Sequence, residues 1–370
     1  MKACPCCGAV QHSKGADARS LRTSAGPVRL SRRHLRCPDC RHSGYAVDDE
    51  VGLGGYLSRR LLRLACLSAA DGSFAQASQH LHEYLALDVC AETLRAYCQK
   101  QGQHMAGWQP SSEAVAFAFA QAPGQPEFQM DAGKVNTPAG WRDLKIAAFA
   151  KRPLAEPAEV ADWASRDLPR PAARTMFAAL EPIDTSQKRL RPQAARLGIT
   201  EPSGLHVRGD GAEWVWNACA SNFPGHTGTL DLYHAAEHLG TACKALHGEG
   251  TEASTGRLER GRERLLSKGW SGLCDFVAEE LSAGETAERR EALEGLMGYF
   301  ATHRHRLGYR ERLAEGRPIG SGLVEGAAKT LGLRLKARGA RWLEGNVDKM
   351  AGLCCLRHST FWDAYWTSRN

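Results

Sequence analysis

The sequence lacks the long apolar runs that a membrane protein needs. A bilayer crossing takes about 20 consecutive apolar residues, and the longest apolar run in this 370-residue chain, residues 114–120, has only the length of a strand. The first residues form no apolar signal segment, and internal repeats and low-complexity runs are absent. We therefore expect a cytoplasmic globular protein without membrane association, long enough for roughly two or three domains.

Acidic residues are scarce at the start of the chain. Residues 1–64 contain twelve lysines and arginines but only five acids, an excess that equals the net charge of the whole chain, +7. The remainder is therefore close to neutral. A basic N-terminal module on a near-neutral body indicates a polyanionic partner. A basic face that only improves solubility is the alternative interpretation.

Cysteines are numerous but do not suggest disulfides. The chain has 13, an odd number without a secretory signal, and five of them lie in the first 40 residues. Cys4 with Cys7 and Cys37 with Cys40 form two Cys-x-x-Cys pairs, and each pair can direct two thiolates at one ion. We predict a zinc ribbon over residues 1–50, whose few apolar residues require the structural Zn²⁺. Other potential ligands in this segment are Cys6, His12, His34 and His42.

Residues 55–105 have helical periodicity. Leucines recur at helical spacing between residues 57 and 67, and Ser73 can cap a helix over residues 73–81. A second helix over residues 89–97, which carries Arg95, follows a short break. This pattern favours a helix-turn-helix DNA-binding domain over residues 55–105, with Arg95 as a DNA contact. Unrelated helical hairpins share the pattern, and residues 104–124 read as a linker rich in Gly, Pro and Ser.

The chain changes character after residue 125, where short apolar runs alternate with helical patterns. We expect strands at residues 128–131, 141–150, 175–180, 205–210 and 229–234, with helices over 184–197, 212–220 and 235–246. The result is a mixed α/β sheet. Residues 125–240 would form the first part of a catalytic core, residues 241–316 an all-helical insertion, and residues 317–370 the final helices of the core.

Three carboxylates stand out in this region. Asp131 and Asp210 each end an apolar strand, and Glu325 follows a glycine-rich turn, Gly320-Ser321-Gly322, at the start of a helix. Singly, Asp210 can cap the next helix and Glu325 can pair with Lys329. Together they suit two Mg²⁺ or Mn²⁺ ions, which can activate a water or a 3′-hydroxyl for an in-line displacement at phosphate.

Basic residues follow Glu325 along the same segment. A nucleic-acid backbone could bind to this positive side, which consists of Lys329, Arg334, Lys336 and Arg338. Trp342 lies just beyond and is either a core residue or a ring that stacks on a base near a strand end.

Three blocks of the sequence resemble the signature blocks of the ISKra family of bacterial insertion-sequence transposases, which belongs to the DDE group and has an RNase H-like catalytic core. The blocks are His206-Val207-Arg208-Gly209-Asp210-Gly211-Ala212-Glu213-Trp214-Val215-Trp216, Leu230-Asp231-Leu232-Tyr233-His234-Ala235-Ala236-Glu237-His238-Leu239 and Gly320-Ser321-Gly322-Leu323-Val324-Glu325. The later Arg334-Leu335-Lys336, Arg341-Trp342 and Leu356-Arg357 also resemble the family's tail. The resemblance covers about residues 130–365; the N-terminal region is similar only in layout.

The resemblance implies that Asp131, Asp210 and Glu325 are the catalytic triad and the Mg²⁺ or Mn²⁺ ligands. It also implies that Asp231 and His234 lie beside the site, as part of an Asp-x-x-His element. The sequence departs from the family after the first aspartate, where Ala132-Gly133 replaces the usual Gly. Asp143 is therefore the nearest alternative to Asp131. His234 and His238 either pack against the sheet or join Asp231 in a second zinc site.

The expected function is that of a DNA transposase in a bacterial cytoplasm, associated with the nucleoid. It would bind the terminal inverted repeats of an insertion sequence, cleave DNA strands and transfer them to a target. Holding two DNA ends implies a homodimer or a larger oligomer on DNA. A metal-dependent nuclease without strand transfer and a non-catalytic DNA-binding regulator are the alternatives.

Overall fold

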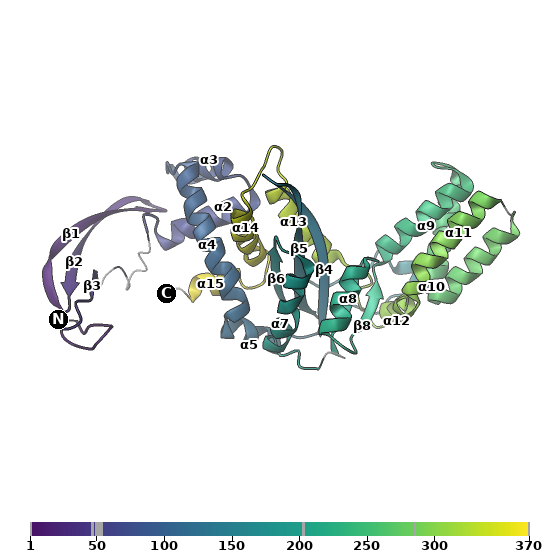
Figure 1. Ribbon diagram of the computed structural model, residues 1–370, viewed down its shortest axis with the longest axis horizontal. Helices are drawn as coiled ribbons and strands as arrows, with labels where there is room; N and C mark the ends of the chain where they lie inside the picture. The colour runs from purple at the N-terminus through teal and green to yellow at the C-terminus, as the bar shows by residue number, and fades with distance from the viewer. Residues whose placement is uncertain (1, 46–47, 49–54, 202–203, 285, 369–370) are drawn as a thin grey trace. The chain divides into compact units, whose positions relative to one another are not determined.

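The computed structural model describes residues 2–45, 48, 55–201, 204–284 and 286–368, and it confirms a mixed α/β fold with a mixed sheet (Figure 1). The chain forms two compact units. The first comprises Met1–Ser111, Asn136–Gly140 and Thr330–Asn370, and the second comprises Ser112–Val135 and Trp141–Lys329. The expected end of the zinc ribbon, at residue 50, lies outside the described residues. None of the helices in the described part of the chain combines the length and apolar character that a bilayer crossing needs.

The first unit begins with a long two-stranded ribbon. Strands β1 (His12–Thr23) and β2 (Gly26–Arg36) pair antiparallel around a tight turn, and the short β3 (Ser43–Tyr45) pairs with the end of β2. The buried apolar side chains of these strands are Leu21 and Leu35. So small a core cannot stabilise a sheet of this length on its own.

Three helices follow the ribbon: α2 (Arg59–Asp71), α3 (Phe74–Leu85) and α4 (Ala91–Ser111). The expected cap is present, because the Ser73 hydroxyl accepts from the Gln76 amide while the Gln76 side chain accepts from the Ser73 amide. The expected linker over residues 104–124 is wrong, since α4 continues to Ser111 and α5 (Glu113–Gln121) follows at once. The apolar run at residues 114–120 is thus helical.

The last helices of the chain belong to the first unit and not to the unit that holds the sheet. Helix α14 (Glu344–Arg357) crosses α4 so closely that a Cβ on Gly102 would lie 1.9 Å from the carbonyl oxygen of Lys349. Glycine permits this approach because it has no side chain. Helix α15 (Trp362–Thr367) adds Tyr365, whose hydroxyl donates to Gln101 at 2.8 Å.

The second unit contains a five-stranded sheet in the order β6-β5-β4-β7-β8. Its strands are β4 (Gln125–Thr137), β5 (Gly140–Arg152), β6 (Ala173–Ala179), β7 (His206–Gly209) and β8 (Thr227–Leu230). Strand β6 runs antiparallel to β5, whereas β7 runs parallel to β4 and β8 parallel to β7. Residues 144–150 of β5 are all buried, as expected of an inner strand covered on both faces.

Helices connect these strands. The bounds of the elements differ from the expected pattern in two places. The connections contain α6 (Ile183–Ser186), α7 (Leu190–Arg196) and α8 (Glu213–Asn222). Strand β4 does not end at Asp131 but continues to Thr137, so Asp131 is a mid-strand residue. The fifth strand ends at Leu230, and α9 (Leu232–His247) starts earlier than expected because Asp231 caps it.

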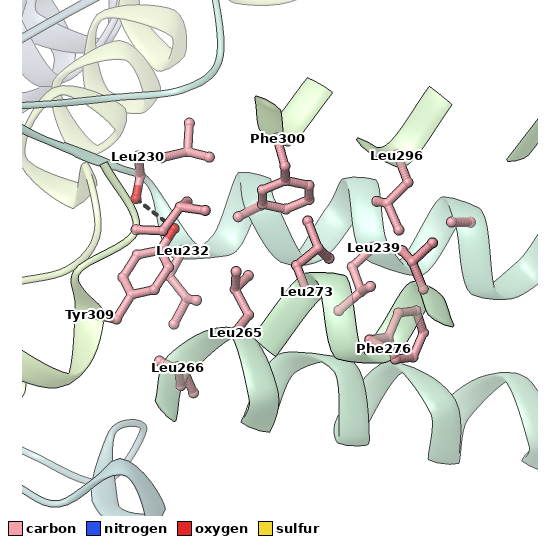
Figure 2. Packing of buried hydrophobic residues seen from close by; sticks show 14 of the residues in the cluster. Leu230, Leu232, Leu239, Leu265, Leu266, Leu273, Phe276, Leu296, Phe300 and Tyr309 are labelled. Carbon is pink, nitrogen blue, oxygen red and sulfur yellow. Dashed lines mark hydrogen bonds between the residues drawn. The ribbon is translucent and has the colours of Figure 1, made fainter. Parts of the chain in front are cut away.

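Residues 241–316 contain no strand among the residues described there. Helices α10 (Glu252–Ser282), α11 (Ala287–Thr302) and α12 (Tyr309–Ala314) pack with α9 around one apolar cluster. Figure 2 shows Leu265 and Phe276 of α10 and Phe300 of α11 facing the α9 side chains. Tyr309 closes the cluster at the sheet end, where its hydroxyl donates to the Leu230 carbonyl at 3.0 Å.

Candidate active site

The strand register brings Asp131 and Asp210 to neighbouring positions. In the parallel pair of β4 and β7, the last aligned residues are Gln129 and Arg208. Asp131 lies two residues further along β4, and Asp210 lies two residues beyond Arg208, directly after the end of β7. The parallel register thus brings the two carboxylates to neighbouring positions, and the charge of Asp210 raises the pKa of Asp131.

Asp131 is half-buried, and its pKa is raised. Burial is the main cause, and the nearby charge of Asp210 raises the pKa further. The Ala132 amide, which donates to Oδ1 at 2.6 Å, acts in the opposite direction, as do the more distant charges of His234 and Lys145. The site therefore holds two carboxylates whose charges repel each other.

Asp210 follows β7 and precedes helix α8. Its Oδ1 accepts from the Ala212 amide at 3.1 Å, and its backbone oxygen accepts from the Trp216 indole at 2.8 Å. The N-cap position of α8 is Ala212, two residues later, so the simple helix-cap interpretation of Asp210 does not hold. Oδ2 has no hydrogen bond to another residue in the described part of the chain, which leaves it available to a ligand.

Glu325 lies in the first turn of α13 (Gly322–Leu335). The Ser321 hydroxyl donates to its Oε1. Burial raises the pKa of Glu325, and the charges of Asp231 and Asp131 add to this effect, while the Ser321 hydrogen bond and His234 oppose it. No ion pair joins Glu325 to Lys329 in the part of the chain that the structure describes, so the helix ion pair weighed from the sequence is not formed.

The turn before Glu325 is held by polar side chains from three neighbouring strands. Arg208 of β7 donates from Nε to the Gly320 carbonyl at 2.8 Å, and Gln129 of β4 accepts the Val324 amide at 2.9 Å. Asp231, directly after β8, accepts the Ser321 amide through Oδ2. The sheet thus fixes the backbone of residues 320–324, and with it the start of the helix that carries Glu325.

Arg208 is itself held by a buried ion pair. Its Nη2 lies 2.6 Å from Oε2 of Glu127, and both side chains are almost fully excluded from solvent. Arg152 lies on the other side of Glu127, at 3.6 Å. Removing one partner of such a pair leaves a buried charge and costs about 3–5 kcal/mol. The arginine two residues before Asp210 is therefore a positioning residue for the site.

Asp231 and His234 form a second, tighter constellation with Glu325. Asp231 is fully buried; it accepts the His234 amide at 2.8 Å and His234 Nδ1 at 3.2 Å through Oδ1. Although burial opposes this, the hydrogen bonds from His234 and Ser321 lower the pKa of Asp231. The hydrogen bond to Asp231 raises the pKa of His234 to about 9. His234 is thus an imidazolium at neutral pH, 4.0 Å from Glu325.

One oxygen or nitrogen each from Asp231, His234 and Glu325 lies within 4.8 Å of the others, the spacing of a potential metal site. Asp131 and Asp210 do not belong to this group in the described part of the chain. They lie near it, because the charge of Asp210 raises the pKa of Asp131 and the charge of Asp131 raises the pKa of Glu325. Asp143 lies outside the group, paired with Lys134 at 2.5 Å.

His238 does not belong to the cluster of Asp231, His234 and Glu325. Its ring stacks on Tyr299 with the ring centroids 3.6 Å apart. The expectation of a second zinc site from Asp231, His234 and His238 is therefore not met, since the tight cluster contains Glu325 in place of His238.

Two further residues near the site were not found from the sequence. Lys145, a buried lysine of β5, lowers the pKa of Asp131 and lies 4.4 Å from the Trp214 ring centroid. Tyr299 of α11 packs on Gly211, where a Cβ would come within 2.3 Å of its ring. Lys145 could have been found from the sequence, because a lysine within an otherwise apolar strand is unusual. Nothing in the sequence pointed to Tyr299, because its position depends on how the helical segment folds back.

The expected DNA contacts fall into two groups. Lys329, Lys336 and Arg338 are exposed, and Arg95 is partly exposed but binds Glu92, with Nε 2.8 Å from Oε2. The structure corrects the expectation for Arg334 and Trp342, which are buried in the first unit.

Arg334 lies 4.9 Å from the Trp342 ring centroid and donates to the Ala69 carbonyl at 2.6 Å, while the Trp342 indole donates to the Leu335 carbonyl at 3.1 Å. The side chains are thus occupied within the protein core. This burial argues against direct contact with DNA for either residue.

The four predicted cysteines meet in the first unit. Sγ of Cys4 lies 3.5 Å from that of Cys40, and Sγ of Cys7 lies 3.5 Å from that of Cys37. All four sulfur atoms are within 4.8 Å of one another, a spacing that could hold a metal such as zinc. Cys6 is exposed and outside this group. His34 is outside it as well and instead hydrogen-bonds Ser43 at 2.6 Å.

No protein-family model matches the chain, and no curated protein matches it either.

Proposed function

We propose that this chain is a DDE-type DNA transposase that binds the terminal inverted repeats of an insertion sequence and catalyses DNA strand cleavage and strand transfer. The observation that carries the proposal is the position of three carboxylates. Asp131 lies within β4 and Asp210 directly follows the adjacent parallel strand β7, each two residues beyond the aligned pair Gln129 and Arg208. Glu325 follows a turn that is hydrogen-bonded to side chains of the same two strands.

The sheet supports an RNase H-like core. An antiparallel pair at one edge and two parallel strands added at the other give the order β6-β5-β4-β7-β8, with the first strand in the centre. In that architecture, the first and fourth strands lie side by side, and these are the strands that lead to Asp131 and Asp210. The helical segment between β8 and α13 then acts as an insertion that returns the chain to the same edge of the sheet.

The chemistry proposed for the site is an in-line displacement at phosphorus. Asp131, Asp210 and Glu325 would hold two Mg²⁺ or Mn²⁺ ions, which supply charge stabilisation and nucleophile activation in such sites. The residues around them have defined tasks. Arg208 and Gln129 fix the Glu325 helix, Ser321 orients the Glu325 carboxylate, and Asp231 holds the His234 ring beside Glu325.

The N-terminal parts of the chain would supply DNA binding. We assign the four-cysteine cluster to a structural zinc ribbon and α2–α4 to a helix-turn-helix DNA-binding domain, with the basic N-terminal residues opposite the DNA phosphates. Lys329, Lys336 and Arg338 remain predicted DNA contacts because they are exposed. Since two DNA ends must be held together, the active form is proposed to be a homodimer or a larger oligomer on DNA.

The test is an in vitro assay with a supercoiled plasmid that carries the element ends, purified protein, and Mg²⁺ or Mn²⁺. Wild-type protein should cut at the ends and join them to a target. Glu325→Gln removes one ligand charge, and we expect cleavage and joining to fall at least about a thousandfold, because the metal-bound transition state loses its charge stabilisation. Asp131→Asn and Asp210→Asn should act alike.

Glu294→Gln is the matched control. It makes the same chemical change at an exposed glutamate of α11 outside the site, so activity should stay within about twofold. Cleaved plasmid without any joined product would favour a nuclease instead. Wild-type protein that binds the ends but never cuts them would favour a non-catalytic regulator. Unchanged cleavage by Glu325→Gln would refute the catalytic assignment.

A further inference from the structure

We infer that one face of the β1–β2 ribbon, here called the open face, lies against double-stranded DNA. The register of the two strands defines this face. Its members pair directly across the ribbon and are Ala16 with Arg33, Ala18 with Ser31, Ser20 with Arg29, and Arg22 with Pro27. The inference rests on the proposed function, because DNA is taken as the partner, and it adds which surface of the chain makes the contact.

The opposite face of the ribbon is occupied by the chain itself. Arg32 lies there with Nη1 2.6 Å from Asp48, and its guanidinium stands 3.9 Å from the Tyr45 ring centroid. The Tyr45 hydroxyl donates to Asp17 at 2.9 Å, and Arg19 pairs with Asp48 at 3.2 Å. Positive charge on this face is therefore neutralised within the ribbon.

On the open face, positive charge is not neutralised. Arg29 and Arg33 are exposed, and neither has a hydrogen-bond or ion-pair partner in the described part of the chain. The face contains no acid, and only Arg22 is tethered, through its Nε to the Tyr56 hydroxyl at 2.7 Å. Between the arginines lie alanines and serines, which let the backbone of both strands approach a surface closely.

These properties fit the major groove of duplex DNA and its phosphates. The groove is about 12 Å wide and admits a two-stranded ribbon, while paired strands are about 4.8 Å apart. Arg29 and Arg33 are four residues apart on β2, which corresponds to roughly 13 Å along an extended strand. Two uncompensated guanidinium groups at that spacing can contact phosphates that flank an inserted ribbon.

The first test removes the two arginines in the full-length protein. Binding to a duplex that contains the element end is measured by fluorescence anisotropy at several salt concentrations. Because each lost phosphate contact lowers the slope of log K against log salt by about 0.9, Arg29→Gln with Arg33→Gln should reduce the slope by about 2. Affinity should fall at least about tenfold near 0.15 M salt. Arg170→Gln with Arg191→Gln, an equal charge change at two exposed arginines of the second unit, serves as control and should leave the slope unchanged.

The second test compares the two faces at constant net charge. Ser31→Glu places an acid in the middle of the open face, and Val28→Glu places it on the opposite face, where Val28 is 41% exposed. We expect Ser31→Glu to weaken duplex binding at least about tenfold more than Val28→Glu. Zinc content and the thermal unfolding midpoint of each variant establish that the ribbon is intact.

The outcomes separate this inference from the proposed function. If Ser31→Glu and Val28→Glu have equal effects and the double arginine variant keeps the wild-type salt slope, the open face does not bind DNA. That result would not bear on cleavage and joining, which are measured separately. Tighter binding to duplex RNA or single-stranded DNA through the same residues overturns the choice of partner. Absence of cleavage by a wild-type protein whose open face still binds duplex DNA refutes the proposed function alone.

Discussion

Asp231 shows how a residue that caps a helix can also set the charge of its neighbour. Its carboxylate accepts the backbone amide of His234 and the ring of the same histidine. The N-terminus of a helix favours a negative charge, and a fully buried carboxylate needs such partners. The same oxygen atom, Oδ1, therefore both caps the helix and holds the imidazole of His234.

This arrangement predicts how His234 titrates. In metal-free protein, the His234 resonance in an NMR titration should report a pKa of about 9, above its ordinary value of 6.5. Because the folded-state pKa is raised, the stabilisation is fully present below about pH 6.5 and is lost as the pH rises through about 9. Asp231→Asn keeps the cap acceptor but removes the charge, and it should return the pKa to near 6.5.

His238 provides the internal comparison in the same spectra. Burial lowers its pKa, and its ring stacks on Tyr299, so Asp231→Asn should move its titration little. A wild-type His234 that titrates near pH 6.5 would show that its ion pair with Asp231 does not form in solution.

At the scale of residues, the sequence singled out the carboxylates but not the side chains that position them. Asp131, Asp210 and Glu325 could be selected as carboxylates in unusual places. Arg208 and Gln129 could not, because a buried arginine or glutamine is meaningful only when its partner is known, and the partners here are backbone groups near residues 320–324. Trp342 was left open between a core position and base stacking, because its ring neighbour Phe74 is distant in the sequence.

The N-terminal ribbon is the element whose stability depends most on a bound metal. Its strands span 12 and 11 residues, yet Leu21 and Leu35 are the buried apolar side chains within them. Zinc bound by Cys4, Cys7, Cys37 and Cys40 would therefore supply most of the free energy that orders this element.

Removal of the metal provides the corresponding prediction. With a chelator, or in the Cys37→Ser variant, the chain should lose about one Zn²⁺, and amides of β1 and β2 should exchange with solvent near the unfolded rate. Amides of β4 and β5 should keep their protection. Cys6→Ser changes an exposed cysteine outside the cluster and should retain both the zinc and the protection; if it behaves like Cys37→Ser, the ligand assignment is incorrect.

Elements were predicted well where one periodicity dominates and poorly where two signals compete. Strand β5 contains the apolar run of residues 146–150; it was expected at residues 141–150 and extends over Gly140–Arg152. Glycine, proline and serine near residues 107–112 suggested a linker, but Ser112 instead caps α5 and Pro110 lies near the end of α4. Turn-forming residues also occur at the junction of two helices, so composition alone could not separate these cases.

On the scale of the whole molecule, the two ends of the sequence contribute to one compact unit. The sequence predicted that residues 317–370 complete the catalytic core, but helices α14 and α15 pack with α4. The periodicity of an amphipathic helix predicts that one face is buried, but it does not predict which partner covers that face. The glycine pair at the crossing, Gly102 and Gly352, is what makes this partner specific.

This arrangement predicts the effect of shortening the chain. A variant that ends after Lys329 keeps every residue of the second unit but lacks α14, so α4 loses its main packing surface. Hydrogen exchange should then show α2–α4 unprotected, while the β4–β7 amides stay protected. Gly102→Ala, which forces α4 and α14 apart without shortening the chain, should give the same pattern more mildly. Full protection of α2–α4 in the shortened protein would contradict the prediction.

The shared unit also has a consequence for synthesis on the ribosome. Domains that are continuous in sequence can fold as they emerge, but α4 must wait for α14, which begins roughly 230 residues after α4 ends, or about 12–47 s at an elongation rate of about 5–20 residues per second. Nascent and prematurely terminated chains would therefore carry the basic N-terminus without a completed helical scaffold behind it. Only a finished polypeptide would present α2–α4 in their packed form, so incomplete products should lack the DNA binding proposed for these helices.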